Sequence, residues 1–274
     1  MNVAILGCGY VGTAVAHYWR HQLGFCVTAT TTTQERTKAL ASVAQRVLVI
    51  RGDDAEGLRS GVQNQDTVLL SVGAPNADSY EETYLQTAQA LVKVLQQAST
   101  VRQLIYTGSY AVYGDQEGAW VDEAALVAPA NPNGQILYDT EQVLLSASSE
   151  TLDVCIFRLG GIYGPGRELV KILGRAAGTT RPGKGEDATN WIHLDDIVAA
   201  IEFARRQRLQ GIYNLVDDAK LTSRELFDLV CQQHNLPPVS WASSQVKGRP
   251  YNARVSNQKL KAAGYQFIHS QRLL

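Results

Sequence analysis

The chain has 274 residues, of which 45% are hydrophobic, and its formal net charge at pH 7 is −1. This composition excludes a disordered chain and predicts a buried core. The charges form no basic stripe or polybasic cluster, which argues against nucleic acid or a membrane surface as a partner. No apolar run approaches the ~18 residues of a membrane span, and no signal peptide is recognised, so a cytoplasmic location is expected.

The four cysteines, Cys8, Cys26, Cys155 and Cys231, are scattered, and none belongs to a C-x-x-C pair. This usage is typical of buried, reduced cysteines in a cytoplasmic protein. The five histidines do not stand at metal-ligand spacing with cysteines or acids. No metal site is therefore predicted.

A glycine-rich pattern opens the chain. The apolar residues 3–6 precede Gly7-Cys8-Gly9-Tyr10-Val11-Gly12, and a helical periodicity follows over residues 13–23. Strand, G-x-G-x-x-G and helix in this order form the dinucleotide-binding fingerprint. The first glycine permits a tight turn, the second lets backbone approach a pyrophosphate, and the third lets helix and strand pack closely. The expected cofactor contacts are therefore Gly7, Gly9, Tyr10, Val11 and Gly12, unless the loop only joins strand to helix.

The second expected strand, residues 25–31, ends in hydroxyl groups rather than in an acid. NAD-binding proteins of this class place a carboxylate ~20 residues past the glycines, on the ribose 2′-hydroxyl. Here Thr30, Thr31 and Thr32 leave room for a 2′-phosphate, and Arg36 offers a positive charge from the next turn. The sequence thus favours NADP over NAD. Strand propensity and helix capping are an alternative explanation for part of the threonine run.

Three further strands are expected, at residues 46–50, 67–72 and 103–107. Asp53, after the first of them, either faces the adenine or caps the next helix. The second ends in Ser71-Val72-Gly73, small residues that let a ligand come close.

The alternation of strands and helices predicts an α/β fold, a Rossmann domain with a doubly wound parallel sheet. This domain is expected over residues 1–165 and also receives residues 195–215. Residues 166–274 mostly form a small C-terminal substrate lobe. The ligand crevice is expected at the carboxyl ends of the strands.

Three later segments identify a family. Residues 106–114 read YTGSYAVYG, residues 157–167 read FRLGGIYGPGR, and residues 190–197 read NWIHLDDI. These segments resemble the extended short-chain dehydrogenase/reductases, which include sugar-nucleotide epimerases and dehydratases. The resemblance implies a nicotinamide cofactor, with Gly160 among its contacts, and a small-molecule substrate such as a sugar nucleotide. It implies a monomer or a homodimer.

In that family a serine and a Tyr-x-x-x-Lys pair carry the chemistry. The resemblance places Ser109 at the serine position, where it would orient the reacting oxygen. The pair itself is missing, because the preferred register puts Asn133 and Leu137 there, and neither does acid–base work at neutral pH. A shifted register makes Tyr138 the first candidate phenol, with a neutral amide in place of the lysine. Tyr113 is the second candidate, and packing is the alternative for both tyrosines.

The position of Tyr138 depends on where its helix begins. At ~100° per residue, position 138 is rotated roughly 140° from position 133. If the helix already begins near Asn133, Tyr138 points away from Ser109. Pro132 and Gly134 permit a later start, which would bring Tyr138 to the site.

Four further residues are candidate substrate contacts: Asn190, Trp191, His193 and Arg167. His193 is also an alternative group for proton transfer. The other possible role of His193 is structural, as a packed side chain beside a helix cap. The sequence predicts an NAD(P)-dependent oxidoreductase, or an epimerase or dehydratase with the same hydride chemistry, that has a degenerate catalytic site. A non-catalytic dinucleotide-binding sensor or regulatory protein is the second hypothesis.

Overall fold

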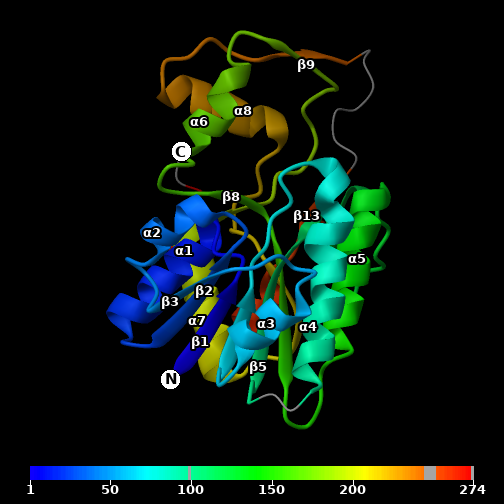
Figure 1. The fold of residues 1–274 in the computed structure, drawn as a ribbon. Helices are drawn as coiled ribbons and strands as arrows, with labels where there is room; N and C mark the ends of the chain where they lie inside the picture. Colours follow the sequence, from blue (N-terminus) through cyan, green and yellow to red (C-terminus); the bar gives the residue numbers. More distant parts are fainter. Residues whose placement is uncertain (98–99, 244–250, 273–274) are drawn as a thin grey trace. The chain divides into compact units, whose positions relative to one another are not determined.

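The computed structural model describes residues 1–97, 100–243 and 251–272, and it divides the chain into two compact units (Figure 1). Unit 1 comprises Met1–Ser109, Pro132–Arg158 and Val198–Tyr213. Unit 2 comprises Tyr110–Asn131, Leu159–Ile197 and Asn214–Leu274. Each unit is therefore assembled from segments that are distant in the sequence. Among the described residues, no helix has the length and apolar character needed to cross a membrane.

A seven-stranded sheet forms the centre of unit 1, with the strand order β11-β7-β5-β4-β1-β2-β3. β1 pairs in parallel with both β2 and β4, so that Ile5 lies opposite Ala29 on one side and Leu69 on the other. The strand order reverses between β1 and β4, which is where doubly wound sheets bind their ligands. The predicted α/β fold class is confirmed. The strands are β1 (Asn2–Leu6), β2 (Cys26–Thr31), β3 (Arg46–Val49), β4 (Thr67–Leu70), β5 (Gln103–Ser109), β7 (Asp153–Leu159) and β11 (Gly211–Leu215).

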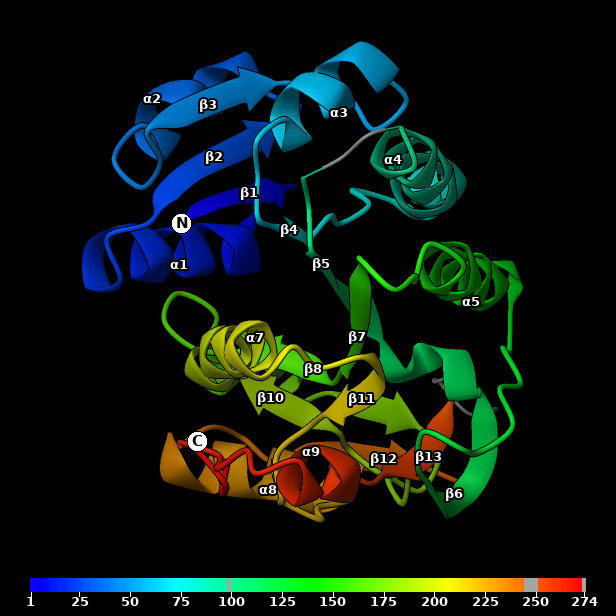
Figure 2. The same ribbon diagram turned by 90° about the horizontal axis from the view of Figure 1, so that it is seen from below.

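Helices cover both faces of this sheet, which explains why its central strands are almost entirely apolar. On one face lie α3 (Ala55–Val62), α4 (Thr87–Leu95) and α5 (Pro132–Leu145), and on the other lie α1 (Tyr10–His17) and α7 (Leu194–Gln207) (Figure 2). Leu91 of α4 and Leu104 of β5 belong to the core under the first group. On the second face the buried indole of Trp19 donates to Glu202 at 3.0 Å. The chain also forms α2 (Thr37–Leu40), π-helical turns at Tyr18–Gln22 and Glu81–Gln86, and 3-10 turns at Gln34–Arg36, Ala77–Ser79, Tyr110–Tyr113 and Gly174–Ala176, of which the last two belong to unit 2.

Among the described residues of unit 2, the strands pair in twos, and the three pairs are parallel. Its main helix α8 (Ser223–Gln233) starts at a capping box, in which Thr222 and Glu225 each bond the other's backbone N–H. Leu226 and Phe227 of this helix join Leu169, the first residue of α6 (Leu169–Leu173), in the unit's apolar core. The pairs are β6 (Asp115–Val121) with β13 (Asn252–Val255), β8 (Gly161–Tyr163) with β10 (Trp191–His193), and β9 (Thr180–Pro182) with β12 (Ser240–Ala242); the other helices are α6 (Leu169–Leu173) and α9 (Gln258–Ala262).

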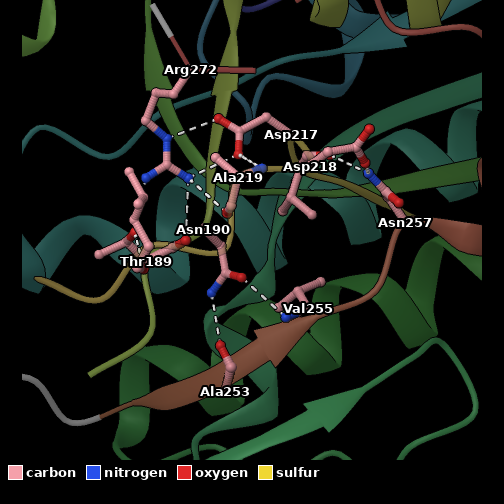
Figure 3. A network of polar contacts seen from close by, with 11 residues as sticks. Thr189, Asn190, Asp217, Asp218, Ala219, Ala253, Val255, Asn257 and Arg272 are labelled. Carbon is pink, nitrogen blue, oxygen red and sulfur yellow. Dashed lines mark hydrogen bonds and ion pairs between the residues drawn. The ribbon is translucent and has the colours of Figure 1, made fainter. Parts of the chain in front are cut away.

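A buried polar network holds the interior of unit 2 together (Figure 3). The Arg272 guanidinium donates to the Asp217 carboxylate at 2.8 and 2.9 Å and to the Thr189 hydroxyl at 2.8 Å. Burial raises the pKa of Asp217, and the ion pair with Arg272 opposes that shift. The Asn190 amide bonds the backbone of β13 through both its nitrogen and its oxygen. The end of the described chain is thus tied into the core of the unit.

None of the four cysteines, all of which the structure describes, is in a disulfide, and three of them are buried, as the sequence predicts. Cys26 differs, because it is exposed at the first residue of β2. The expectation of burial is wrong there because the covered part of the strand begins only at Val27.

Candidate cofactor site

The three glycines of the loop after β1 differ in what a side chain would meet at each position. Gly7 has φ +85°, which favours glycine, and a Cβ there would lie 2.6 Å from the Ser71 carbonyl oxygen. A Cβ on Gly12 would lie 2.7 Å from the Gly7 carbonyl oxygen. At Gly9, by contrast, a Cβ would meet nothing within 4 Å. Packing requires glycine at positions 7 and 12, whereas the missing side chain of Gly9 leaves open space beside the start of α1.

Helix α1 begins directly after this loop, and no side chain caps its N-terminus. Its N-cap is Gly9, and no acidic residue lies in its first turn. Val11 is buried and Tyr10 is half-buried, so the first turn reaches the surface on one side. A helix N-terminus carries a partial positive charge and attracts anions such as phosphate. The start of α1 therefore suits a pyrophosphate.

A cavity of about 410 Å³ opens beside the loop, entirely within unit 1. This volume lies in the range of ordinary small-molecule sites. Its described lining comes from the loop, the end of β2, the segments after β3 and β4, and the start of the helical region before α4. The lining residues are Leu6, Gly7, Thr30, Thr31, Thr32, Ile50, Arg51, Gly52, Leu58, Val72, Pro75, Ser79, Glu82, Thr83 and Thr87.

The threonines at the end of β2 and just after it line the cavity, and two of them also have structural roles. The Thr30 hydroxyl accepts the Gly7 backbone N–H at 3.0 Å, and the Thr31 hydroxyl accepts the Thr33 backbone N–H at 3.2 Å. Both side chains are buried. Thr32 is exposed at the cavity wall. The threonine run therefore fixes the loop as well as bordering the cavity.

The cation at the cavity wall is Arg51, which sequence reasoning missed. Arg36, the predicted cation, lies exposed in a 3-10 turn and is not part of the described lining. Arg51 pairs with Glu82, which also lines the cavity, and with Asp53 at 3.4 Å. Its position just after β3 was the available signal, because strands β2 and β3 are neighbours and end at the same edge.

Asp53 does not cap the following helix, so that alternative is wrong. The cap of α3 is Asp54, whose carboxylate accepts the Gly57 backbone N–H at 2.9 Å. Asp53 instead pairs with Arg51, and it is not part of the described cavity lining.

The segment that follows β4 also borders the cavity. The Ser71 hydroxyl accepts from the Thr107 hydroxyl at 3.0 Å, and the Ser71 backbone N–H donates to the Leu6 carbonyl at 2.8 Å. Val72 lines the cavity, and a Cβ on Gly73 would meet nothing within 4 Å. Ser71 is therefore a structural residue here, whereas Val72 and Gly73 offer open surface.

Helix α5 begins at Pro132, which decides the face on which Tyr138 lies. Asn133 is already inside the helix, and Leu137 and Glu141 follow it at four-residue spacing on one face. Glu141 reaches the end of β5, because its Oε1 lies 3.5 Å from where a Cβ of Gly108 would stand. The face toward β5 therefore carries Asn133 and Leu137. Tyr138 is rotated roughly 140° from Asn133 and is half-buried, so the early helix start argues against it as the phenol beside the serine.

A buried ion pair anchors α5 to the sheet. Arg158 of β7 donates from Nε and Nη2 to the Glu141 carboxylate at 2.7 to 3.2 Å. The side chains are 2% and 1% exposed. Burial raises the pKa of Glu141, and Arg158 opposes that shift. Ser109, the last residue of β5, is half-buried in the same unit.

The candidate residues in unit 2 are largely committed to packing. Tyr113 is fully buried, and its phenol donates to Asn214 at 2.9 Å. The Asn190 amide donates to the Ala253 carbonyl at 2.8 Å and accepts from the Val255 backbone N–H at 3.0 Å. These contacts favour structural roles for both residues.

Trp191 and Gly160 also have local explanations. The Trp191 indole packs edge-on against the Tyr163 ring at a centroid distance of 6.3 Å. A Cβ on Gly160 would lie 2.9 Å from the Asn190 carbonyl, so glycine lets these segments approach. Arg167 is exposed, and His193 is buried, with its Nδ1 accepting the Asp195 backbone N–H at 3.1 Å.

The reversed strand order, the glycine loop and the cavity beside it define unit 1 as a Rossmann-like domain of the dinucleotide-binding class. The sequence matches the model of the NAD dependent epimerase/dehydratase family over residues 3–215. The chain belongs to this family, which confirms the predicted resemblance.

The chain is also similar to individual known proteins in sequence and in structure. Protein YeeZ of Escherichia coli K12 is 30% identical over 90% of this chain and 89% of its own length. The dTDP-glucose 4,6-dehydratase of Streptomyces griseus is 29% identical over 66% of this chain and 60% of its own length. Among solved structures, MoeE5 in complex with UDP-glucuronic acid and NAD has a TM-score of 0.80 at 20% identity, covering 96% of this chain and 92% of that chain. At this identity the likeness shows the fold.

Proposed function

We propose that the chain binds a nicotinamide dinucleotide in the cavity beside the glycine loop. The observation that carries this proposal is Gly9, where no packing contact excludes a side chain and where its absence leaves the start of α1 open. Similar structures, MoeE5 and the Bacillus anthracis dTDP-glucose 4,6-dehydratase, were solved with NAD, which supports the assignment. When bound, the nicotinamide supplies hydride transfer, and the chain binds and orients the reactants.

We further propose that NADP is preferred over NAD. The end of β2 carries threonines where a carboxylate would bind the ribose 2′-hydroxyl. A 2′-phosphate needs a cationic hydrogen-bond donor, and Arg51 lines the cavity that Thr30, Thr31 and Thr32 also border. Arg51 replaces Arg36 as the proposed partner of that phosphate.

Arg51→Ala is expected to weaken NADPH binding about 10- to 100-fold, because a hydrogen bond to a charged group contributes about 1.5–3 kcal/mol. NADH binding should change little, since NADH has no 2′-phosphate. Arg36→Ala is the matched control, because it removes the same charge from a residue outside the cavity lining. Isothermal titration calorimetry with both nucleotides measures the effect. An equal loss for NADH and NADPH, or a larger loss in Arg36→Ala, would contradict the assignment.

The proposed reaction is that of an NAD(P)-dependent oxidoreductase, epimerase or dehydratase with a degenerate catalytic site. Ser109 would hold the reacting oxygen of a small substrate, of which a sugar nucleotide is the leading class. The helix face toward β5 offers Asn133 and Leu137, so no acid–base pair of the usual kind stands there. The proton-transfer group therefore differs from the tyrosine–lysine pair of other members.

Ser109→Ala is expected to lower hydride transfer about 100-fold or more and to leave cofactor binding unchanged. The assay follows nicotinamide absorbance with UDP- and dTDP-sugars as substrates, with NADPH titration as the binding control. Turnover that survives in Ser109→Ala would remove the serine from the reaction. The second candidate function, a non-catalytic dinucleotide sensor, is favoured by the residues at 133 and 137. It predicts cofactor binding without turnover of any substrate by the unchanged protein.

A further inference from the structure

Three side chains able to bind a metal converge in unit 2, and none of them is among the described lining residues of the cavity in unit 1. His193 ends β10, Asp195 lies in the first turn of α7, and His269 lies in the last described segment of the chain. One ligand atom from each side chain can be chosen so that all three lie within 4.8 Å of one another. The Asp195 Oδ2 atom lies 3.4 Å from the His193 Nδ1 atom and 3.1 Å from the His269 Nε2 atom.

The fold holds these side chains in place without an ion. His193 is paired with Tyr163 across the β8–β10 ladder, and the Tyr163 ring packs edge-on against its imidazole at 5.1 Å. Asp196, which is fully buried, accepts the backbone N–H groups of Ile268 at 2.7 Å and of His269 at 2.9 Å. These hydrogen bonds fix the last segment where the His269 imidazole meets Asp195.

The ligand set and the two separations that involve Asp195 match zinc. Zinc takes imidazole nitrogens at ~2.0–2.1 Å and carboxylate oxygens at ~2.0–2.2 Å in tetrahedral sites. Neighbouring ligand atoms of such a tetrahedron are ~3.3–3.6 Å apart. The separations of 3.1 and 3.4 Å are close to this value. Mg²⁺ and Ca²⁺ prefer sets made of oxygen atoms, so two imidazoles disfavour them.

We propose that His193, Asp195 and His269 bind a Zn²⁺ ion, with a water molecule in the fourth position. Two histidines, one carboxylate and an open position form a site of the catalytic type rather than a closed structural one. The open side faces solvent, because the Asp195 side chain is 53% exposed and that of His269 is 20% exposed, against 7% for His193. Coordination through the His193 Nδ1 atom replaces one hydrogen bond, the one from the Asp195 backbone N–H.

The test is calorimetric titration of Zn²⁺ into full-length protein that has been stripped with a chelator. One equivalent should bind, and both His269→Ala and Asp195→Asn should weaken binding at least tenfold. His21→Ala is the matched control, because His17 and His21 form the other close pair of histidine rings among the described residues, with centroids 4.8 Å apart. That variant should bind Zn²⁺ as the unchanged protein does.

A second measurement guards against a folding defect in the variants. Without metal, His269→Ala should melt at the temperature of the stripped protein, and only the unchanged protein and His21→Ala should gain stability when Zn²⁺ is added. Co²⁺ in the unchanged protein should show the visible absorption bands of a tetrahedral site, and these should disappear in His269→Ala. Failure of the unchanged protein to bind Zn²⁺, or binding that is lost in His21→Ala and kept in His269→Ala, would overturn the proposal.

Discussion

The variant Gly9→Asp is expected to bind NADPH and NADH about 100-fold more weakly than the unchanged protein, or worse, while its fold stays intact. A Cβ at this position meets nothing within 4 Å, so the added side chain has room. The carboxylate, however, stands at the start of α1, where the pyrophosphate would lie, and juxtaposed like charges cost several kcal/mol. Fluorescence titration of the nicotinamide measures the loss, and thermal melting checks the fold.

Two controls show whether the loss of dinucleotide affinity comes from added negative charge in general or from disturbed packing of the loop. Gln96→Glu adds the same charge on an exposed side chain at the end of α4 and should leave both affinities unchanged. Gly12→Ala should instead lower the melting temperature, since its Cβ would lie 2.7 Å from the Gly7 carbonyl oxygen. Unchanged dinucleotide affinity in a folded Gly9→Asp protein would show that the ligand does not pass over this loop.

Breaking the buried pair of α5 is expected to have the largest effect on stability. Arg158→Ala should lower the free energy of unfolding by about 3–5 kcal/mol, because it leaves the Glu141 carboxylate buried without its partner. The pair is almost completely shielded, and its hydrogen bonds run at 2.7 to 3.2 Å. Urea denaturation followed by circular dichroism measures the loss.

The companion variants test whether the uncompensated charge is the cause. The double variant Glu141→Leu/Arg158→Met removes both charges and should recover most of the lost stability. Arg59→Ala breaks an exposed pair with Glu56 and should cost less than about 1 kcal/mol. A double variant as unstable as Arg158→Ala would mean that packing volume, rather than the charge, controls this site.

The sequence predicted the parts of the fold that local patterns specify. The run 2–31 forms strand, loop and helix as expected, because an apolar run, glycines and a helical periodicity act over a few residues. The geometric reasons for Gly7 and Gly12 also followed from the motif alone. Cofactor binding at the loop stays a prediction.

The features that could not be predicted from the sequence depend on contacts between residues that are far apart in the chain. Arg51 and Glu82 meet at the cavity although 31 positions separate them. Asp195 and His269 are 74 positions apart, so no metal-ligand spacing could be read from the sequence. The start of α5 at Pro132 is a different case, since the proline permitted either register and only the structure places Asn133 inside the helix.

Direct titration of the purified protein with NADPH and with NADH tests the central claim most simply. Nicotinamide fluorescence and melting temperature should both report saturable binding of either nucleotide, and NADPH should bind more tightly. At a ligand concentration of 100 times Kd, mass action stabilises the folded state by about 2.7 kcal/mol, which is easily seen in a melting curve. A folded protein that binds neither nucleotide would contradict the cofactor assignment, and the proposed hydride chemistry would fall with it.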